Sequence, residues 1–152
     1  MIDHITLHVS NAERSIAFYT KALSPLGYIP KAHHEPTIGF GVDDGTPRSD
    51  FYISPMDGPA QQPIPTHIAF RATNEQAVRD FYEAAITAGG MDNGRPGPRA
   101  YHSGYYAAFV LDPWTAITSK LSQTGRTQAN HEIGRRIAKS HRVTLRSQRY
   151  LR

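Results

Sequence analysis

The sequence contains an internal repeat, and this repeat constrains the fold more than any other feature. Residues 3–10 read Asp-His-Ile-Thr-Leu-His-Val-Ser, and residues 66–73 read Thr-His-Ile-Ala-Phe-Arg-Ala-Thr. The match continues without a gap through an asparagine, an aromatic pair and a glycine in each copy. A strand that begins with a histidine and leads into a helix therefore recurs. This pattern predicts two related modules and makes His4 and His67 the first candidates for chemistry.

The first copy is typical of one strand, one helix and three further strands. Apolar and polar residues alternate over residues 2–9, so His4, Thr6 and His8 are expected on one face. Ser10 and Glu13 form a capping box for a helix that ends near residues 25–27. Strands are expected at residues 28–33, 37–42 and 49–54, and four prolines within residues 55–65 indicate a linker.

The second copy repeats this order. A strand over residues 66–72 leads into a helix that Thr73 and Gln76 would cap and a glycine pair would end. A loop, a strand buried on both faces and a last short strand are expected at residues 92–98, 104–111 and about 115–121. The fold class is therefore predicted as α+β, with two βαβββ modules, helices outside and sheets around a shared cleft that His4 and His67 would enter.

Composition excludes several classes of protein. The chain of 152 residues has no cysteine, which rules out a disulfide framework and thiolate-bound metal and fits a cytoplasmic location. No apolar run approaches the roughly 20 residues of a membrane span, and the N-terminus lacks the pattern of a signal peptide. Basic residues dominate only after residue 119, so the body is mildly acidic although the whole chain carries a formal charge of +4.

At this point the sequence resembles the vicinal oxygen chelate superfamily, which includes glyoxalase I, bleomycin-resistance proteins and extradiol dioxygenases. The resemblance lies in residues 2–10 with Ser-Ile-Ala-Phe-Tyr at 15–19, Thr-His-Ile-Ala-Phe at 66–70, and Ala-Ala-Phe-Val-Leu-Asp-Pro at 107–113. It implies a cleft of the glyoxalase/bleomycin-resistance type, a homodimer, and a divalent metal such as Zn, Ni, Fe or Mn. The metal ligands would come from the first and last strands of each half. His4 and His67 match the two first-strand positions.

The last-strand positions depart from the family pattern. Tyr52 stands near the first of them, where no glutamate is present, and Ser119 occupies the second. The family ending would be Asp-Pro-Asp-Gly-Asn-x-Ile-Glu, whereas residues 112–120 read Asp-Pro-Trp-Thr-Ala-Ile-Thr-Ser-Lys. Without these carboxylates, glyoxalase I activity is not expected.

We hypothesise that a change of reading frame after Pro113 caused the departure. Residues 114–120 can be written with the codons TGG ACG GCA ATA ACA TCG AAG. Read two bases later, they give GAC GGC AAT AAC ATC GAA, which encodes Asp-Gly-Asn-Asn-Ile-Glu. Only the first base of each shifted triplet is free to choose. The sequence therefore predicts one domain over residues 1–121, with repeats at about 1–54 and 66–121, followed by a frameshift-derived basic tail at 122–152. The alternative for the tail is a nucleic-acid-binding arm, but its single basic segment lacks interleaved aromatic residues, so no nucleic-acid or membrane partner is predicted.

Each histidine of the first strands has two interpretations. His4 and His67 are either metal ligands or polar residues that line a cavity, because zinc sites normally use at least three protein ligands. His8 shares the His4 face and either helps to line the pocket or lies at the surface.

Four further residues are candidates for ligand binding. Arg71 could pair with an anionic substrate or with a carboxylate of the body, and His102 could donate to a ligand or face solvent. Tyr52 and Tyr105 could line the ligand site or belong to the core or its rim. Arg99 is expected to be solvated.

Two functions remain open. One is a glyoxalase-related, metal-dependent lyase or dioxygenase that acts on a small oxygenated substrate and is impaired in this chain. The other is a metal-free protein of the bleomycin-resistance type that sequesters an aromatic or planar small molecule.

Overall fold

The computed structural model describes residues 2–58, 64, 66–112 and 120–123. Its first half contains β1 (Ile5–Val9), α1 (Ala12–Leu23), the short 3-10 helix η1 (Ser24–Leu26), β2 (Tyr28–His34), β3 (Thr37–Val42) and β4 (Phe51–Pro55). Its second half contains α2 (Glu75–Thr87), β5 (Met91–Asp92), β6 (Gly97–Pro98), β7 (Tyr106–Leu111) and β8 (Lys120–Gln123). The predicted α+β class is confirmed.

The first sheet has the strand order β1-β4-β3-β2. β1 and β4 run parallel in a register that extends from Ile5 opposite Phe51 to Val9 opposite Pro55, and the other neighbours are antiparallel. All the strands expected in this half are present. Pro55 is the last residue of β4 and so belongs to the sheet, whereas the proline pattern had assigned it to the linker.

The second sheet is built around β7. β5 pairs with one end of β7, β6 pairs with the other end, and β8 pairs with the opposite edge. β7 is buried on both faces, as its apolar sequence predicted. The expected loop at residues 92–98 contains the second residue of β5 and both residues of β6. Of the last strand expected at 115–121, residues 115–119 lie outside the described residues, and β8 includes the other two.

Residues 66–72 do not form the strand that the repeat predicted. In the first half, the equivalent segment is held by parallel pairing with the last strand of that half. The second half would have to supply such a partner after Pro113, where the structure describes only β8, and β8 pairs with β7. The alternation survives without the pairing, because Ile68, Phe70 and Ala72 are buried whereas the residues between them are exposed.

The helix caps differ by one residue from the prediction in both copies. Asn11 caps α1, and its side-chain oxygen accepts a hydrogen bond from the backbone N–H of Arg14 at 3.0 Å. Asn74 caps α2 in the same way through the N–H of Ala77 at 2.9 Å. The predicted Ser10 and Thr73 caps are wrong because an asparagine follows each, and its short amide satisfies the orphan N–H groups of the first turn equally well.

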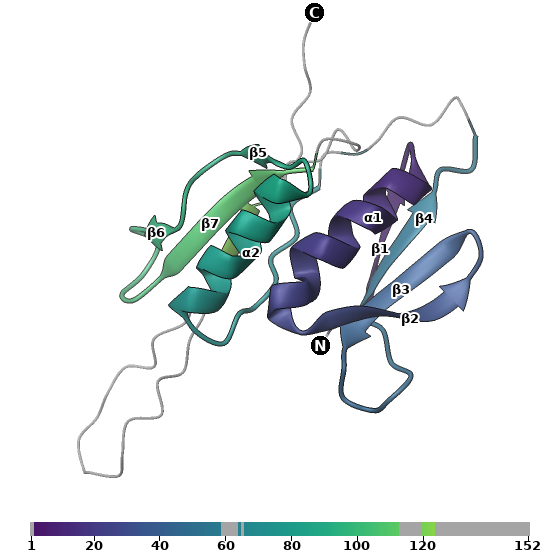
Figure 1. The fold of residues 1–152 in the computed structure, drawn as a ribbon, viewed down its shortest axis with the longest axis horizontal. Helices are drawn as coiled ribbons and strands as arrows, with labels where there is room; N and C mark the ends of the chain where they lie inside the picture. Colours follow the sequence, from purple (N-terminus) through teal and green to yellow (C-terminus); the bar gives the residue numbers. More distant parts are fainter. Residues whose placement is uncertain (1, 59–63, 65, 113–119, 124–152) are drawn as a thin grey trace, which may run out of the picture.

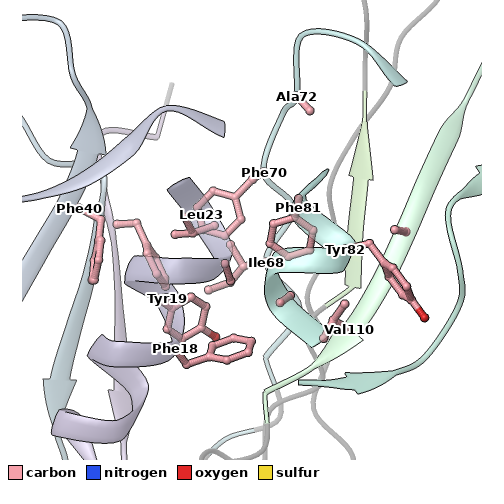
Figure 2. Packing of buried hydrophobic residues seen from close by; sticks show 14 of the residues in the cluster. Phe18, Tyr19, Leu23, Phe40, Ile68, Phe70, Ala72, Phe81, Tyr82 and Val110 are labelled. Carbon is pink, nitrogen blue, oxygen red and sulfur yellow. The ribbon is translucent and has the colours of Figure 1, made fainter. Parts of the chain in front are cut away.

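The two halves share one hydrophobic core. Figure 1 shows α1 and α2 side by side, each lying across the strands of its own half. The core contains α1 residues such as Phe18 and Tyr19 and α2 residues such as Phe81, and Figure 2 shows Ile68 and Phe70 between these two groups. Helix α1 therefore covers one face of the first sheet, and polar residues such as Thr6, His8 and Tyr52 lie on its other face. None of the described helices is long and apolar enough to cross a membrane.

Candidate functional site

Tyr52 lies at the centre of the polar face of the first sheet. It is opposite Thr6 of β1 on one side and Gly39 of β3 on the other. A Cβ on Gly39 would stand 2.6 Å from Cε1 of Tyr52 and 2.8 Å from the Ser49 side chain. Because only a residue without a side chain fits there, the glycine lets the Tyr52 ring lie across β3.

His4 lies next to Tyr52. The two rings meet edge to face with centroids 5.4 Å apart, and His4 Nδ1 is 2.9 Å from the Asp3 carboxylate. The structure therefore brings together the first-strand and last-strand positions that the sequence singled out in the first half. The donors there are one imidazole, already bonded through Nδ1, and one phenol.

His8 lies further along the same face, opposite Ser54. Its Nδ1 is 3.3 Å from the carbonyl oxygen of Pro55, and the ring is exposed. The Ser54 hydroxyl is 2.6 Å from that of Thr37. This end of the face is polar, and its hydroxyl groups are paired with each other.

A cavity of about 580 Å³ opens beside Tyr52, under the loop that joins β3 to β4. Its volume is within the range of about 300–1,000 Å³ that is usual for small-molecule sites. The apolar part of its lining includes Ile2 and Val42, and four charged residues complete it: Asp3, Asp44, Arg48 and Asp50.

The loop above this cavity is held by a buried lysine. Lys31, whose side chain is 8% exposed, donates to the carbonyl of Val42 at 2.6 Å and to Asp44 at 2.7 Å. The hydrogen bond from Lys31, together with those from Thr46, holds the pKa of the Asp44 carboxyl far below its usual range. The Lys31–Asp44 pair therefore stays ionised and fixes the loop to the sheet.

A smaller cavity of about 230 Å³ lies between the two halves. Ile5 and Ile68, which are equivalent in the repeat, both line it, and Arg71 and Asp50 contribute charged groups. The two first-strand segments thus approach each other here, but neither His4 nor His67 lines this cavity. His67 directly precedes Ile68 and is exposed.

Tyr28 connects this cavity with the larger one through Asp50, which lines both. The Tyr28 hydroxyl donates to Asp50 Oδ2 at 2.9 Å. Burial, and then the negative charge and hydrogen bond of Asp50, raise the pKa of the Tyr28 phenol above its usual value. Tyr28 therefore remains neutral and acts as a donor to a charged carboxylate.

His102 and Tyr105 contact each other but line neither cavity. Their ring centroids are 4.8 Å apart, and Tyr105 is buried in a second, smaller apolar cluster with Ala107 and Phe109. The guanidinium of Arg99 lies 5.0 Å from the centre of the Phe109 ring and donates to the Pro98 carbonyl. Arg99 is thus partly exposed, and one side of its guanidinium lies against the Phe109 ring.

The donor set does not fit a divalent metal. Within the described part of the chain, no group of three or more histidine, aspartate or glutamate side chains could hold one. His4 is accompanied by Tyr52 where a carboxylate would be needed, and Ser119 lies outside the described residues. Two histidines are short of the three protein ligands that zinc sites use.

Sequence reasoning missed the charged lining of the larger cavity. Asp3 lies within the repeat but is replaced by Thr66 in the second copy, and Arg48 and Asp50 lie near the end of a turn-rich loop. Charged residues next to strand ends are frequent in binding sites. That signal was present in the sequence, but the fold was needed to show that the loop turns back over Tyr52.

Comparisons with known proteins identify the family of the chain. A family model for the Glyoxalase/Bleomycin resistance protein/Dioxygenase superfamily matches residues 1–115. No curated protein matches the chain.

Three solved structures illustrate the shared fold. A glyoxalase/bleomycin resistance protein from Albidiferax ferrireducens T118 is 23% identical, with a TM-score of 0.59 over 82% of this chain and 97% of that chain. A glyoxalase-related enzyme from Fulvimarina pelagi is 16% identical, with a TM-score of 0.56 over 82% and 88%. Glyoxalase I from Zea mays is 22% identical, with a TM-score of 0.58 over 83% and 45%. These similarities establish the fold, and the family match establishes that the chain belongs to the Glyoxalase/Bleomycin resistance protein/Dioxygenase superfamily.

Proposed function

We propose that the protein binds a small organic molecule in the cavity beside Tyr52, without a metal, in the manner of the bleomycin-resistance members of its superfamily. The observation that supports this function is the cavity of about 580 Å³, which combines an aromatic ring, apolar side chains and charged groups. Sites of this kind fix a ligand by an apolar wall and a few polar contacts. The Tyr52 ring would provide the wall for a planar ligand.

Titration calorimetry with a panel of neutral planar aromatic compounds tests this function. Replacing Tyr52 by alanine should weaken the binding roughly three- to tenfold, since an aromatic pair contributes about 0.5–1.5 kcal/mol. Tyr101→Ala provides the matched control, because Tyr101 is 67% exposed and lines neither cavity. Equal losses in both variants, or no binding to the wild-type protein, would contradict the proposal.

The second candidate function is a metal-dependent lyase or dioxygenase with His4 and His67 as ligands. It is favoured by the family match and by the contact between His4 and Tyr52, which stand at the first-strand and last-strand ligand positions of the first half. Metal analysis of the purified protein separates the two candidates. Near-stoichiometric Ni, Zn, Fe or Mn that is lost in a His4→Ala/His67→Ala variant supports the enzyme. Absence of metal supports the binding protein. His8, Arg71, His102 and Tyr105 remain proposed ligand contacts, of which Arg71 borders a cavity.

We also propose that the chain changes reading frame after Pro113, so that residues 1–121 form the domain and residues 122–152 a basic tail. The family match that ends at residue 115 is consistent with this, and so is the lack of strand structure at residues 66–72 in the described part of the chain. Resequencing the gene is the direct test, and codons that cannot encode Asp-Gly-Asn-Asn-Ile-Glu in the shifted frame would refute it. A variant with Trp114→Asp, Thr115→Gly, Ala116→Asn, Ile117→Asn, Thr118→Ile and Ser119→Glu should gain metal affinity if Ser119 occupies the ligand position.

The family resemblance also supports a homodimer, and the absence of cysteine fits a cytoplasmic location. Light scattering on the purified protein tests the first proposal. Fractionation of the cells that produce it tests the second.

A further inference from the structure

The charges around the larger cavity are unequally compensated. Asp44 is matched by the ammonium group of Lys31 at 2.7 Å. Asp50 receives a hydrogen bond from the Tyr28 phenol, which is neutral, so the negative charge of this carboxylate has no cationic partner among the described side chains. Only Oδ2 of Asp50 is engaged in that bond, and Oδ1 can accept another.

Arg48 lines the same cavity and carries the complementary charge. In the part of the chain that the structure describes, its guanidinium forms no ion pair, including none with Asp50 two residues later. Its backbone N–H donates to the hydroxyl of Thr46 at 3.4 Å. One cation and one anion therefore border a single cavity without neutralising each other.

The remaining charged residue adds to the negative side. Asp3 lies against His4, whose Nδ1 is 2.9 Å from its carboxylate. A purely anionic ligand bound at Arg48 would be repelled by Asp3 and Asp50. A purely cationic ligand bound at Asp50 would be repelled by Arg48. A ligand that carries both charges would satisfy both sides at once.

From this arrangement we infer that the cavity selects a small zwitterion, namely an amino acid with an aromatic or apolar side chain. Its carboxylate binds Arg48, its ammonium group binds Asp50, and its side chain packs against Tyr52, Ile2 and Val42. This inference rests on the proposed binding function and names the ligand class for the same site.

Four related probes separate the contributions of the two charges. L-phenylalanine carries both charges, L-phenylalaninamide only the ammonium, N-acetyl-L-phenylalanine only the carboxylate, and 3-phenylpropanamide neither. Their dissociation constants for the full-length protein are measured by titration calorimetry. L-phenylalanine is expected to bind at least tenfold more tightly than any of the other three.

Two variants test which residue binds each charged group of the ligand. Arg48→Gln should weaken L-phenylalanine binding to the level of the amide and leave the amide itself unaffected or improved. Asp50→Asn should weaken L-phenylalanine binding to the level of the N-acetyl compound. The side-chain oxygen of the asparagine can still accept the hydrogen bond from Tyr28. Arg95→Gln is the matched control, because the Arg95 side chain is 85% exposed and lines neither cavity.

The outcomes are distinguishable. If all four probes bind equally, or if the two variants weaken all four alike, the zwitterion inference is overturned while the binding function stands. If 3-phenylpropanamide and the other aromatic compounds bind but L-phenylalanine does not, the inference is also wrong. If no aromatic compound of either panel binds at millimolar concentration, both the inference and the proposed function fail.

Discussion

Phe51 of β4 meets Phe70 of the second half edge to face, with ring centroids 5.1 Å apart. Phe70 also contacts Tyr28 at 5.4 Å. Because residues 66–72 are not held by strand pairing, these aromatic contacts fix their position against the first half. The contact between residues 66–72 and the first half is therefore made by side chains.

A double-mutant cycle tests the contact between Phe51 and Phe70. Phe51→Leu and Phe70→Leu should be coupled by about 0.5–1.5 kcal/mol in the free energy of unfolding, as expected for an aromatic pair. Urea denaturation of both single variants and the double variant measures the coupling. The cycle of Phe51→Leu with Phe109→Leu is the control, since Phe109 belongs to the separate cluster and its effect should add within about 0.5 kcal/mol. Equal coupling in both cycles would contradict the proposed role of Phe70.

Gly39→Ala should destabilise the protein. The added Cβ would lie 2.6 Å from the Tyr52 ring and 2.8 Å from Ser49, and overpacking of this kind costs about 1–3 kcal/mol. Gly58→Ala is the matched control, because no atom of the described residues outside its chain neighbours lies within 4 Å of its new Cβ and its φ angle is not positive. Chemical denaturation compares the two, and a loss as large in Gly58→Ala as in Gly39→Ala would disprove the steric explanation.

Asn74→Ala should cost about 1 kcal/mol of stability, because the variant leaves the N–H of Ala77 without its cap. Gln76→Ala should cost only a few tenths of a kcal/mol, since Gln76 donates to Asp80 one turn later on the exposed helix surface. Thermal unfolding followed by circular dichroism measures both. The reverse order would restore the Thr73–Gln76 capping box that the sequence suggested.

The Lys31–Asp44 pair should give a pH-dependent contribution to stability. The folded state lowers the pKa of Asp44, so this contribution is fully present above the unfolded pKa of about 3.9. It is lost as the pH falls below that value toward the folded pKa. Wild-type protein should therefore exceed Asp44→Asn in melting temperature at pH 7 and pH 5, and the difference should shrink in strong acid. A difference that stays constant into strong acid would show that the carboxylate charge is not its cause. Asp43→Asn, at the neighbouring exposed position, is the control.

Much of the fold could be predicted from sequence because local signals were strong. Alternation identified the β1 face, and the repeat with its capping residues identified both helices. Residues 66–72 were mispredicted because their alternation is real but the neighbouring strand they require is not formed by the described residues. Strand pairing depends on two segments, so the alternation of apolar and polar residues within one segment cannot predict it.

The candidate site was predictable only in part. The repeat identified His4 and His67, and the family pattern pointed to Tyr52. Arg48 and Asp50 could not be found in this way, because their roles depend on how a loop folds back over β3 and on which carboxylates already have partners. Lys31 likewise reads as an ordinary surface lysine in the sequence, yet its side chain is buried.

The unequal pairing of the two copies has a consequence for local motion. In β1, the amide groups are secured by a ladder to β4, whereas residues 66–72 are secured mainly by Ile68 and Phe70. Hydrogen exchange in residues 66–72 should therefore report openings of low free energy that leave the first sheet intact. The exchange rate of each amide in β1 can then be compared with that of the equivalent amide in residues 66–72. The difference within one molecule reports how much pairing with a neighbouring strand stabilises such a segment.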